Sequence, residues 1–204
     1  MEFKDTINKR RSVRNYDNSK EVTDAQLKEL FDTVSLSPSS YNLQPWEFIA
    51  VRDKDTKKQL KECANGQPFV QDASAVIIVL GNLKPEKNAA VIGADRMKKG
   101  LMDEAKSKRF EAAAKMLSED KEKGKVWSIR SASLAAMTLM LAAQNMGLAT
   151  CPMEGYNSDC VRELLSIPQE YELVMMVTLG YSKEPASERP MRFGYDKIVH
   201  LEKF

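Results

Sequence analysis

The sequence has 204 residues, of which 43% are hydrophobic and 29% are charged. This length fits one domain, and the composition supports a packed core and excludes a disordered chain. The 31 basic and 29 acidic side chains leave a net charge of +2, which argues against a nucleic-acid-binding surface.

The lack of a recognisable targeting signal and the spacing of the cysteines indicate a cytoplasmic protein. No N-terminal stretch has the features of a secretory signal, and no apolar run reaches about 18 residues without polar interruption. The chain's three cysteines, Cys63, Cys151 and Cys160, are widely spaced and lack the pairing that holds zinc. We therefore expect a soluble cytoplasmic protein with reduced, mostly buried thiols, no metal, and no membrane or nucleic-acid partner.

The first elements carry clear helix signals. Phe3 and Ile7 lie four residues apart, which predicts a short amphipathic helix that ends near an arginine cluster. Thr23 is placed to cap a second helix, and Gln26 stands at the third position of that helix. This second helix should end before Pro38.

Strands and helices alternate irregularly along the remainder. Apolar runs predict strands at 47–52, 75–81 and 173–179, a strand-like segment at 148–150, and a short terminal strand at 198–201. Helices are expected at 54–62 and at 131–146, the latter apolar on nearly every face and therefore buried. Residues 92–125 are charged and predict an exposed helical excursion. All of these elements fit a single domain over 1–204.

An arginine cluster follows the first helix. Arg10, Arg11, Ser12 and Arg14 place three guanidinium groups and a hydroxyl within five residues. Guanidinium donors match the oxygens of a phosphate in a bidentate way, so the cluster is a candidate phosphate site. The alternative is a solvated helix terminus, to which an arginine pair alone would usually belong.

Polar loops supply further candidate ligands. Ser39, Ser40, Asn42 and Gln44 precede Pro45 and Trp46, although serine, proline and asparagine are also typical of a surface turn. Another segment carries Asn65 and Gln67 around a glycine, and it reads equally well as an ordinary turn. A third, from Cys151 to Tyr156, contains Pro152, Met153, Glu154 and Gly155, and cations at Lys183, Arg189 and Arg192 precede the end of the chain.

Taken together, these segments resemble the FMN-dependent nitroreductase family. The strongest match is Pro-Ser-Ser-Tyr-Asn-Leu-Gln-Pro-Trp at 38–46, which agrees with the family pattern at every polar position. The resemblance implies a nitroreductase-like α+β fold, in which helices surround a central mixed β-sheet. It also implies a homodimer that exchanges its C-terminal strands and holds FMN at the subunit interface.

The resemblance assigns roles to the candidate residues. It places Arg10 and Ser12 on the FMN phosphate, Arg11 on the phosphate or ribityl chain, and Arg14 at the pyrimidine edge of the flavin ring. One of Asn65 and Gln67 would face that edge, and main-chain amides of Glu154 and Gly155 would donate toward N5 and O4.

Other implied roles involve the partner and the tail. Ser39, Ser40, Asn42 and Gln44 would reach the cofactor of the opposite subunit. Arg192, with Arg189 as second candidate, would close over the phosphate. Phe110, Met116 and Trp127 are candidates to line the opening over the flavin, although each fits simple packing better.

The implied activity is that of an oxidoreductase. NADH or NADPH would reduce FMN by hydride transfer, and a nitroaromatic, a quinone or a similar small acceptor would then replace it in a ping-pong mechanism. No catalytic side chain is required because the flavin carries the chemistry. A flavin-binding module with a sensing or partner role, and a specialised dehydrogenase on the same fold, remain alternatives.

Overall fold

The computed structural model describes residues 2–84 and 86–204. Its strands are β1 (Trp46–Val51), β2 (Ala75–Asn82), β3 (Ala149–Met153) and β4 (Tyr171–Gly180). Its helices are α1 (Phe3–Lys9), α2 (Asp24–Val34), the 3-10 helix η1 (Ser40–Asn42), α3 (Lys54–Cys63), α4 (Pro68–Asp72), α5 (Glu86–Lys98), α6 (Glu104–Glu119), α7 (Lys121–Asn145), α8 (Ser158–Leu164) and α9 (Tyr195–Ile198).

The four strands form one sheet in the order β1-β2-β4-β3, and each neighbouring pair is antiparallel. Ile78 on β2 pairs with Ile49 on β1 and with Met176 on β4. The expected mixed sheet is therefore wrong for these strands. In the described part of the chain, parallel pairing occurs at an isolated bridge between Ser12 and Thr150, where the N-terminal segment adds to the β3 edge.

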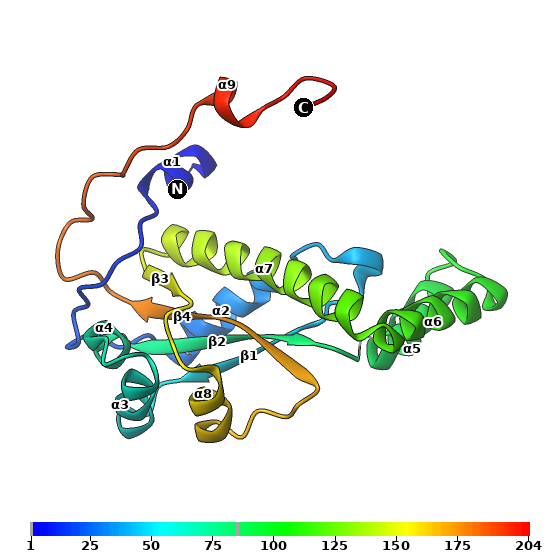
Figure 1. The fold of residues 1–204 in the computed structure, drawn as a ribbon, viewed down its shortest axis with the longest axis horizontal. Helices are drawn as coiled ribbons and strands as arrows, with labels where there is room; N and C mark the ends of the chain where they lie inside the picture. Colours follow the sequence, from blue (N-terminus) through cyan, green and yellow to red (C-terminus); the bar gives the residue numbers. More distant parts are fainter. Residues whose placement is uncertain (1, 85) are drawn as a thin grey trace.

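Side chains of β2 alternate between two hydrophobic cores, one on each face of the sheet. Val76, Ile78 and Leu80 belong to the core that contains side chains of α3, α4 and α8. Ala75, Ile77 and Val79 belong to the core that contains side chains of α2 and α7. Every residue of β2 is buried, as its continuous apolar run predicts. Figure 1 shows these helices on opposite faces of the sheet.

α7 is longer than its apolar sequence predicts. It begins at Lys121, ten residues before the expected start, because the Asp120 carboxylate caps it by accepting from the Lys123 amide. Its later turns carry small residues, including Ala132, Ala135 and Ala136, that pack on the sheet. α7 has the length and hydropathy of a membrane span, yet it contributes to the core against the sheet, so it is a core helix.

The charged excursion consists of α5 and α6, which pack together, and of the first turns of α7 (Figure 1). Phe110 lies in a small separate core with Leu43, Ala89 and Ala114. The Arg96 guanidinium lies 5.1 Å from the centre of the Phe110 ring. Phe110 therefore serves as packing, as does Trp127 beside this core, whereas Met116 is 68% exposed.

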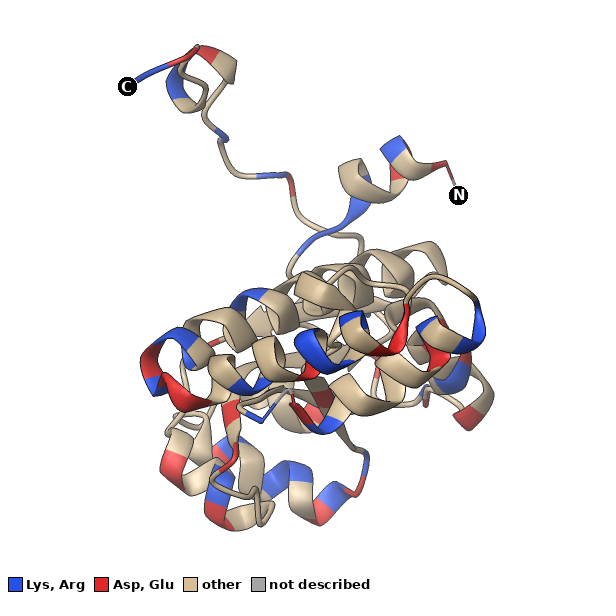
Figure 2. Ribbon diagram, turned by 90° about the vertical axis from the view of Figure 1, so that its right-hand side faces the viewer, with Lys and Arg blue, Asp and Glu red and all other residues tan. Residues whose placement is uncertain are grey.

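The C-terminal tail leaves the body of the molecule. The strand expected at 198–201 is not formed in this single chain: Ile198 ends the short helix α9, and Val199 to Leu201 pair with no strand in the described residues. The tail and α1 project from the body on the same side in both Figure 1 and Figure 2.

The cysteines differ from the sequence expectation. Cys63 and Cys160 form a disulfide with their Cα atoms 5.5 Å apart, across 97 residues of sequence. The expectation of three reduced thiols is therefore wrong for this pair, because the fold brings the end of α3 next to α8. Cys151 is free and buried.

Candidate functional site

The arginine cluster lies on an extended segment that joins the edge of the sheet. After α1, the Val13 amide donates to the Thr150 carbonyl at 3.0 Å. Extended backbone sends alternate side chains to opposite sides. Arg14, Ser12 and Arg10 accordingly share one side of this segment, and all three lower the pKa of the thiol of Cys151, the residue after Thr150 on β3.

Arg10 lies among other positively charged side chains. Its Nη1 atom is buried and has no hydrogen-bond partner among the residues described. Desolvation lowers the pKa of Arg10, and the neighbouring guanidinium groups of Arg189, Arg11 and Arg192 lower it further. Because a buried donor without a partner is costly, this arrangement fits an anion supplied from outside the chain.

Arg11 and Arg189 instead use their donors on backbone. Arg11 donates to the carbonyls of Asn8 at 2.7 Å and Arg10 at 3.0 Å, and its Nε reaches the Ser187 carbonyl at 3.1 Å. Arg189 donates to the carbonyls of Ile7 at 2.7 Å and Arg10 at 3.0 Å. The last carbonyls of a helix lack partners within the helix and attract cations. Both arginines therefore stabilise the end of α1 and fasten the tail to it.

The structure thus divides the four arginines by their contacts. Arg10 keeps a free guanidinium nitrogen, whereas the donors of Arg11 and Arg189 face carbonyl oxygens. Arg192, the cation that the sequence ranks first in the tail, donates locally to Pro190 at 3.1 Å and Met191 at 3.0 Å. It still lies close enough that its positive charge lowers the pKa of Arg10. The tail therefore brings two further cations to the first cluster.

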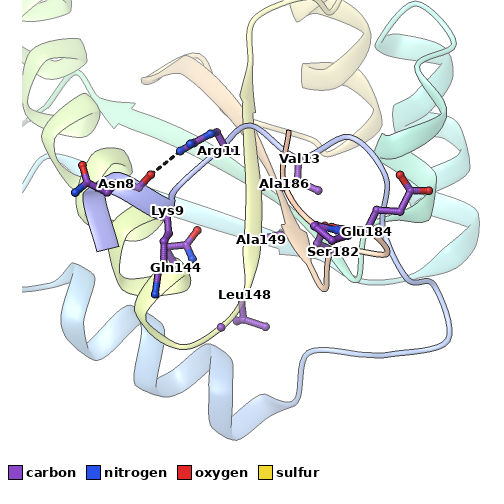
Figure 3. A pocket seen from close by; sticks show the side chains of 12 residues that line it. Asn8, Lys9, Arg11, Val13, Gln144, Leu148, Ala149, Ser182, Glu184 and Ala186 are labelled. Atoms are coloured by element: carbon purple, nitrogen blue, oxygen red, sulfur yellow. Dashed lines mark hydrogen bonds between the residues drawn. The ribbon is translucent and has the colours of Figure 1, made fainter. Parts of the chain in front are cut away.

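A pocket of about 420 Å³ lies between the N-terminal segment, the end of α7 and the tail. Figure 3 shows Arg11 bonded to Asn8 at its rim, with Gln144 and Leu148 on one side and Glu184 on another. Arg11 and Val13 line it, whereas Arg10 does not. Because Arg10 is not among the lining residues, this pocket does not define the candidate phosphate site.

Arg14 and Cys151 mark the other end of the cluster. The Arg14 guanidinium lies 6.0 Å from the centre of the Phe69 ring on α4, within reach of a cation–π interaction. Burial raises the pKa of the Cys151 thiol, although Arg14, Ser12 and Arg10 oppose that shift. Cys151 is therefore a packed neutral thiol, as the sequence indicates, and Phe69 is a neighbour of the site that no sequence pattern singles out.

Two carboxamides converge on one carbonyl oxygen. Asn65 donates to the Gly155 carbonyl at 3.1 Å, and Gln67 donates to the same oxygen at 2.9 Å. Gln67 also donates to Ala64 at 3.0 Å, which fixes its side chain. The turn that presents them needs left-handed backbone at Asn65 (φ 56°) and Gly66 (φ 70°), a conformation that asparagine and glycine tolerate. The structure therefore joins the segments 65–67 and 154–155.

The amides of Glu154 and Gly155 are available to a ligand. β3 ends at Met153, so the next two residues lie beyond the strand ladder and are exposed. Within the described residues, neither amide donates a hydrogen bond to the chain. Such amides are suitable donors for an oxygen or nitrogen that gains negative charge.

The loop from Ser39 to Gln44 lies away from the arginines. The Ser39 hydroxyl accepts from the Gln44 amide at 2.9 Å, while Asn88 of α5 donates to the Leu43 carbonyl at 2.9 Å. Asn42 (φ 59°) and Gln44 (φ 47°) have left-handed backbone, while Leu43 between them is buried in the small core with Phe110. In Figure 1 this loop lies far from α1 and α4. One chain therefore does not unite Ser39, Ser40, Asn42 and Gln44 with the arginine cluster.

No group of three or more His, Cys, Asp or Glu side chains within 2–84 and 86–204 is arranged to hold a metal ion. The ligand chemistry of the described site consists of guanidinium groups, carboxamides, hydroxyls and main-chain amides.

The fold and site define an α+β protein with a cationic cluster at the edge of an antiparallel sheet. The family model for the nitroreductase family matches residues 7–181, and the chain belongs to this family. It is 37% identical over 203 residues to a Bacillus subtilis protein named putative NAD(P)H nitroreductase MhqN, a match that covers 98% of this chain and 96% of that protein.

Solved structures agree with the sequence comparison. The crystal structure of the putative nitroreductase ydfN from Bacillus subtilis has a TM-score of 0.92 and 34% identity, with 97% of both chains covered. A putative nitroreductase from Exiguobacterium sibiricum, solved in complex with FMN, has a TM-score of 0.90 and 27% identity, and covers 99% of this chain and 98% of that one. These matches support a nitroreductase-like α+β fold over nearly the whole chain.

Proposed function

We propose that this protein is a cytoplasmic FMN-dependent oxidoreductase that uses NADH or NADPH to reduce small acceptors such as nitroaromatics or quinones. The observation that carries the proposal is the buried Nη1 of Arg10, which lacks a partner within a cluster of like charges. A phosphate monoester of nearly two negative charges would supply both the missing acceptor and the missing counter-charge.

The proposed site holds FMN at two ends. Arg10 and Ser12 bind the phosphate, Arg192 adds positive charge, and Arg11 and Arg189 hold the backbone that presents them. Arg14 lies toward the ring end of the site, beside Phe69. Asn65 and Gln67 orient the pyrimidine edge. Their two hydrogen bonds to the Gly155 carbonyl keep both carboxamides next to the segment that carries the free amides.

FMN, when bound, supplies the group that accepts a hydride from NAD(P)H and returns electrons to the acceptor. The chain's own contribution is electrostatic. A cation at Arg14 and amide donors at Glu154 and Gly155 favour negative charge on the ring without any proton transfer from a side chain. Since one opening serves both substrates in turn, the proposal gives ping-pong kinetics.

The proposed active form is a homodimer. Large apolar side chains are exposed on α1, on the outer side of α7 and along the tail, namely Phe3, Leu134, Met137, Met191, Phe193, Ile198 and Leu201. Contiguous exposed apolar surface marks association sites, and a projecting tail suits the exchange of terminal segments between two copies. In this dimer the 39–44 loop completes the site of the partner.

An anaerobic absorbance titration tests the proposed activity. Added FMN should bind, and its absorbance band should bleach with NADH or NADPH and return when a quinone is added. Bound flavin that is not bleached by either nucleotide would favour a binding module without turnover. Protein that binds no FMN would overturn the cofactor assignment.

Mixed dimers test the subunit arrangement. Arg10→Ala impairs the phosphate end of a site, and Asn42→Ala with Gln44→Ala impairs the loop that we assign to the partner's site. A mixed dimer of the two variants should place both defects in one site and leave the other site intact. It should therefore bind about one FMN, half the wild-type amount. If the loop serves its own chain, both sites are defective and no binding returns.

A further inference from the structure

The Cys63–Cys160 disulfide joins the two segments that present the carboxamides and free amides of the site. Cys63 is the last residue of α3, two positions before Asn65. Cys160 lies on α8, which begins three residues after Gly155. The disulfide therefore joins the end of the helix before Asn65 to the helix that follows Gly155.

Hydrogen bonds add to this connection. The Asn157 amide donates to the Cys63 carbonyl at 2.8 Å, and the Asn157 side chain caps α8 by accepting from the Cys160 amide at 3.0 Å. Further along the same two segments, Asn65 and Gln67 meet the Gly155 carbonyl. The covalent bond and these hydrogen bonds thus hold one unit, so a change at the sulfur atoms alters the restraint on Asn65 and Gly155.

The sulfur atoms are within reach of a reagent from outside. A surface depression of about 390 Å³ is lined by both cysteines and by side chains of α3 and α8, namely Gln59, Glu62, Glu163 and Leu164. Cys160 is partly exposed, whereas Cys63 is 5% exposed. An incoming thiolate therefore meets the Cys160 sulfur first.

We infer that Cys63 and Cys160 form a reversible thiol–disulfide site whose state controls how tightly the flavin ring end is held. This inference rests on the proposed FMN site. In cytoplasmic proteins, disulfides are usually redox-sensing or catalytic and are seldom permanent. The reacting partner is a dithiol, chosen because its second thiol releases the protein from the mixed disulfide.

The exchange balances in two steps. One thiolate of the dithiol attacks Cys160, which forms a mixed disulfide and releases Cys63 as a thiolate that takes up a proton. The second thiolate of the dithiol then attacks its own mixed-disulfide sulfur, and Cys160 leaves and is protonated. The dithiol loses two electrons and becomes a disulfide, and the protein gains two electrons and two protons.

Reduction removes the covalent link between the end of α3 and α8, so the segments carrying Asn65 and Gly155 are held by hydrogen bonds and by core packing alone. FMN should therefore bind the oxidised form more tightly, by at least about fivefold, the lower range of a typical coupling between sites. Linkage requires the reciprocal effect. Saturating FMN should lower the equilibrium constant for reduction of the disulfide by the dithiol, by the same factor.

Thiol counting and FMN titration test the inference. Protein purified without reductant and then denatured should show one free thiol, that of Cys151, and three after dithiothreitol treatment. The FMN dissociation constant is then measured before reduction, after reduction and after reoxidation, at a temperature where circular dichroism shows intact fold. Affinity should fall on reduction and return on reoxidation.

Matched variants separate this effect from loss of fold. Cys63→Ser combined with Cys160→Ser should bind FMN as reduced wild type does and should ignore dithiothreitol. Cys151→Ala should keep the wild-type ratio between the two redox states. Three thiols without reductant, or equal FMN affinity in both states, would overturn the inference alone. If neither the oxidised nor the reduced protein binds FMN, the proposed function is overturned as well.

Discussion

Arg189 donates through Nη2 to the backbone carbonyl of Arg10 at 3.0 Å, so a hydrogen bond holds together two residues whose side chains carry the same charge. The same nitrogen reaches the Ile7 carbonyl at 2.7 Å at the end of α1. Desolvation lowers the pKa of Arg10, and repulsion by the Arg189 guanidinium lowers it further. The tail is thus held where its charge makes the Arg10 position more favourable for an anion.

We expect Arg189→Met to release the tail. Limited proteolysis should cut the chain near residue 190 faster than in wild type, because the contacts to α1 and Arg10 are lost. FMN binding should weaken less than in Arg10→Met, since Arg189 acts through backbone. Lys183→Met removes a tail cation before these contacts and is the control. Equal rates of proteolysis for wild type, Arg189→Met and Lys183→Met would contradict the assignment of Arg189.

Arg10→Met should change stability and binding in opposite directions. In the protein without cofactor, removing a desolvated cation among like charges should leave the thermal midpoint unchanged or raise it. FMN binding should weaken by about 1.5 to 3 kcal/mol, roughly 10- to 150-fold, if one charged hydrogen bond is lost. Calorimetry and fluorescence titration measure the two effects.

The matched control for Arg10→Met is Lys58→Met, which removes a positive charge from the exposed side of α3. This control should bind FMN as wild type does. If Arg10→Met lowers the thermal midpoint of the FMN-free protein and leaves FMN affinity unchanged, Arg10 is a structural residue and the phosphate site lies elsewhere.

Local signals in the sequence predicted much of the fold. The capping box of Thr23 and Gln26 is present as expected, because both partners lie within one turn. The strand containing Ile77 and Ile78 is confirmed, since a fully apolar run of that length suits a strand covered on both faces. The sequence places the start of α7 ten residues too late, because the first turns of this helix are charged.

Long-range relationships were not accessible from the pattern. Cys63 and Cys160 are separated by 97 residues, and their spacing carries no pairing signal. Likewise, Arg189 and Arg192 are chemically alike in sequence, and the contacts of Arg189 with α1 depend on where the tail folds back. The site segments were recognised by resemblance, whereas Gly155 as a common acceptor required the three-dimensional structure.

Gln67→Glu should impair flavin reduction more than Gln67→Ala does. The carboxylate would place negative charge against the Gly155 carbonyl, which now accepts from the Gln67 amide at 2.9 Å. It would also oppose electron density arriving on the ring. Stopped-flow reduction by NADPH under anaerobic conditions measures the rate, and Asn65→Ala reports the share of the second carboxamide. Identical rates for Gln67→Glu and wild type would exclude contact with the ring.

Stability should decline at alkaline pH. Burial raises the pKa of the Cys151 thiol above its ordinary value of 9.0, and burial also raises the pKa values of Tyr16 and Tyr156. The folded state therefore holds these protons more tightly than the unfolded chain. This contribution is complete below the unfolded-state pKa and is lost as pH rises through the folded-state pKa.

For the thiol alone, Cys151→Ala should make the free energy of unfolding less dependent on pH above about 8.5, close to the ordinary pKa of a thiol. Urea unfolding across this range measures the slope, and wild type at pH 7 supplies the reference. A slope identical to that of wild type would mean that Cys151 titrates alike in the folded and unfolded states.

Gly81 and Ser128 provide a test of packing between β2 and α7. A Cβ atom at Gly81 would meet the Ser128 hydroxyl oxygen, which is buried and has no partner among the described residues. Gly81→Ala should therefore destabilise the protein by about 1 to 3 kcal/mol, the usual cost of overpacking a core. Ser128→Ala removes that hydroxyl and leaves its Cβ 3.4 Å from the new methyl group. In urea unfolding, the double variant should recover most of the lost free energy of unfolding, because the clash and the unpaired oxygen disappear together. Additive effects of the two substitutions would show that the two residues do not share this contact.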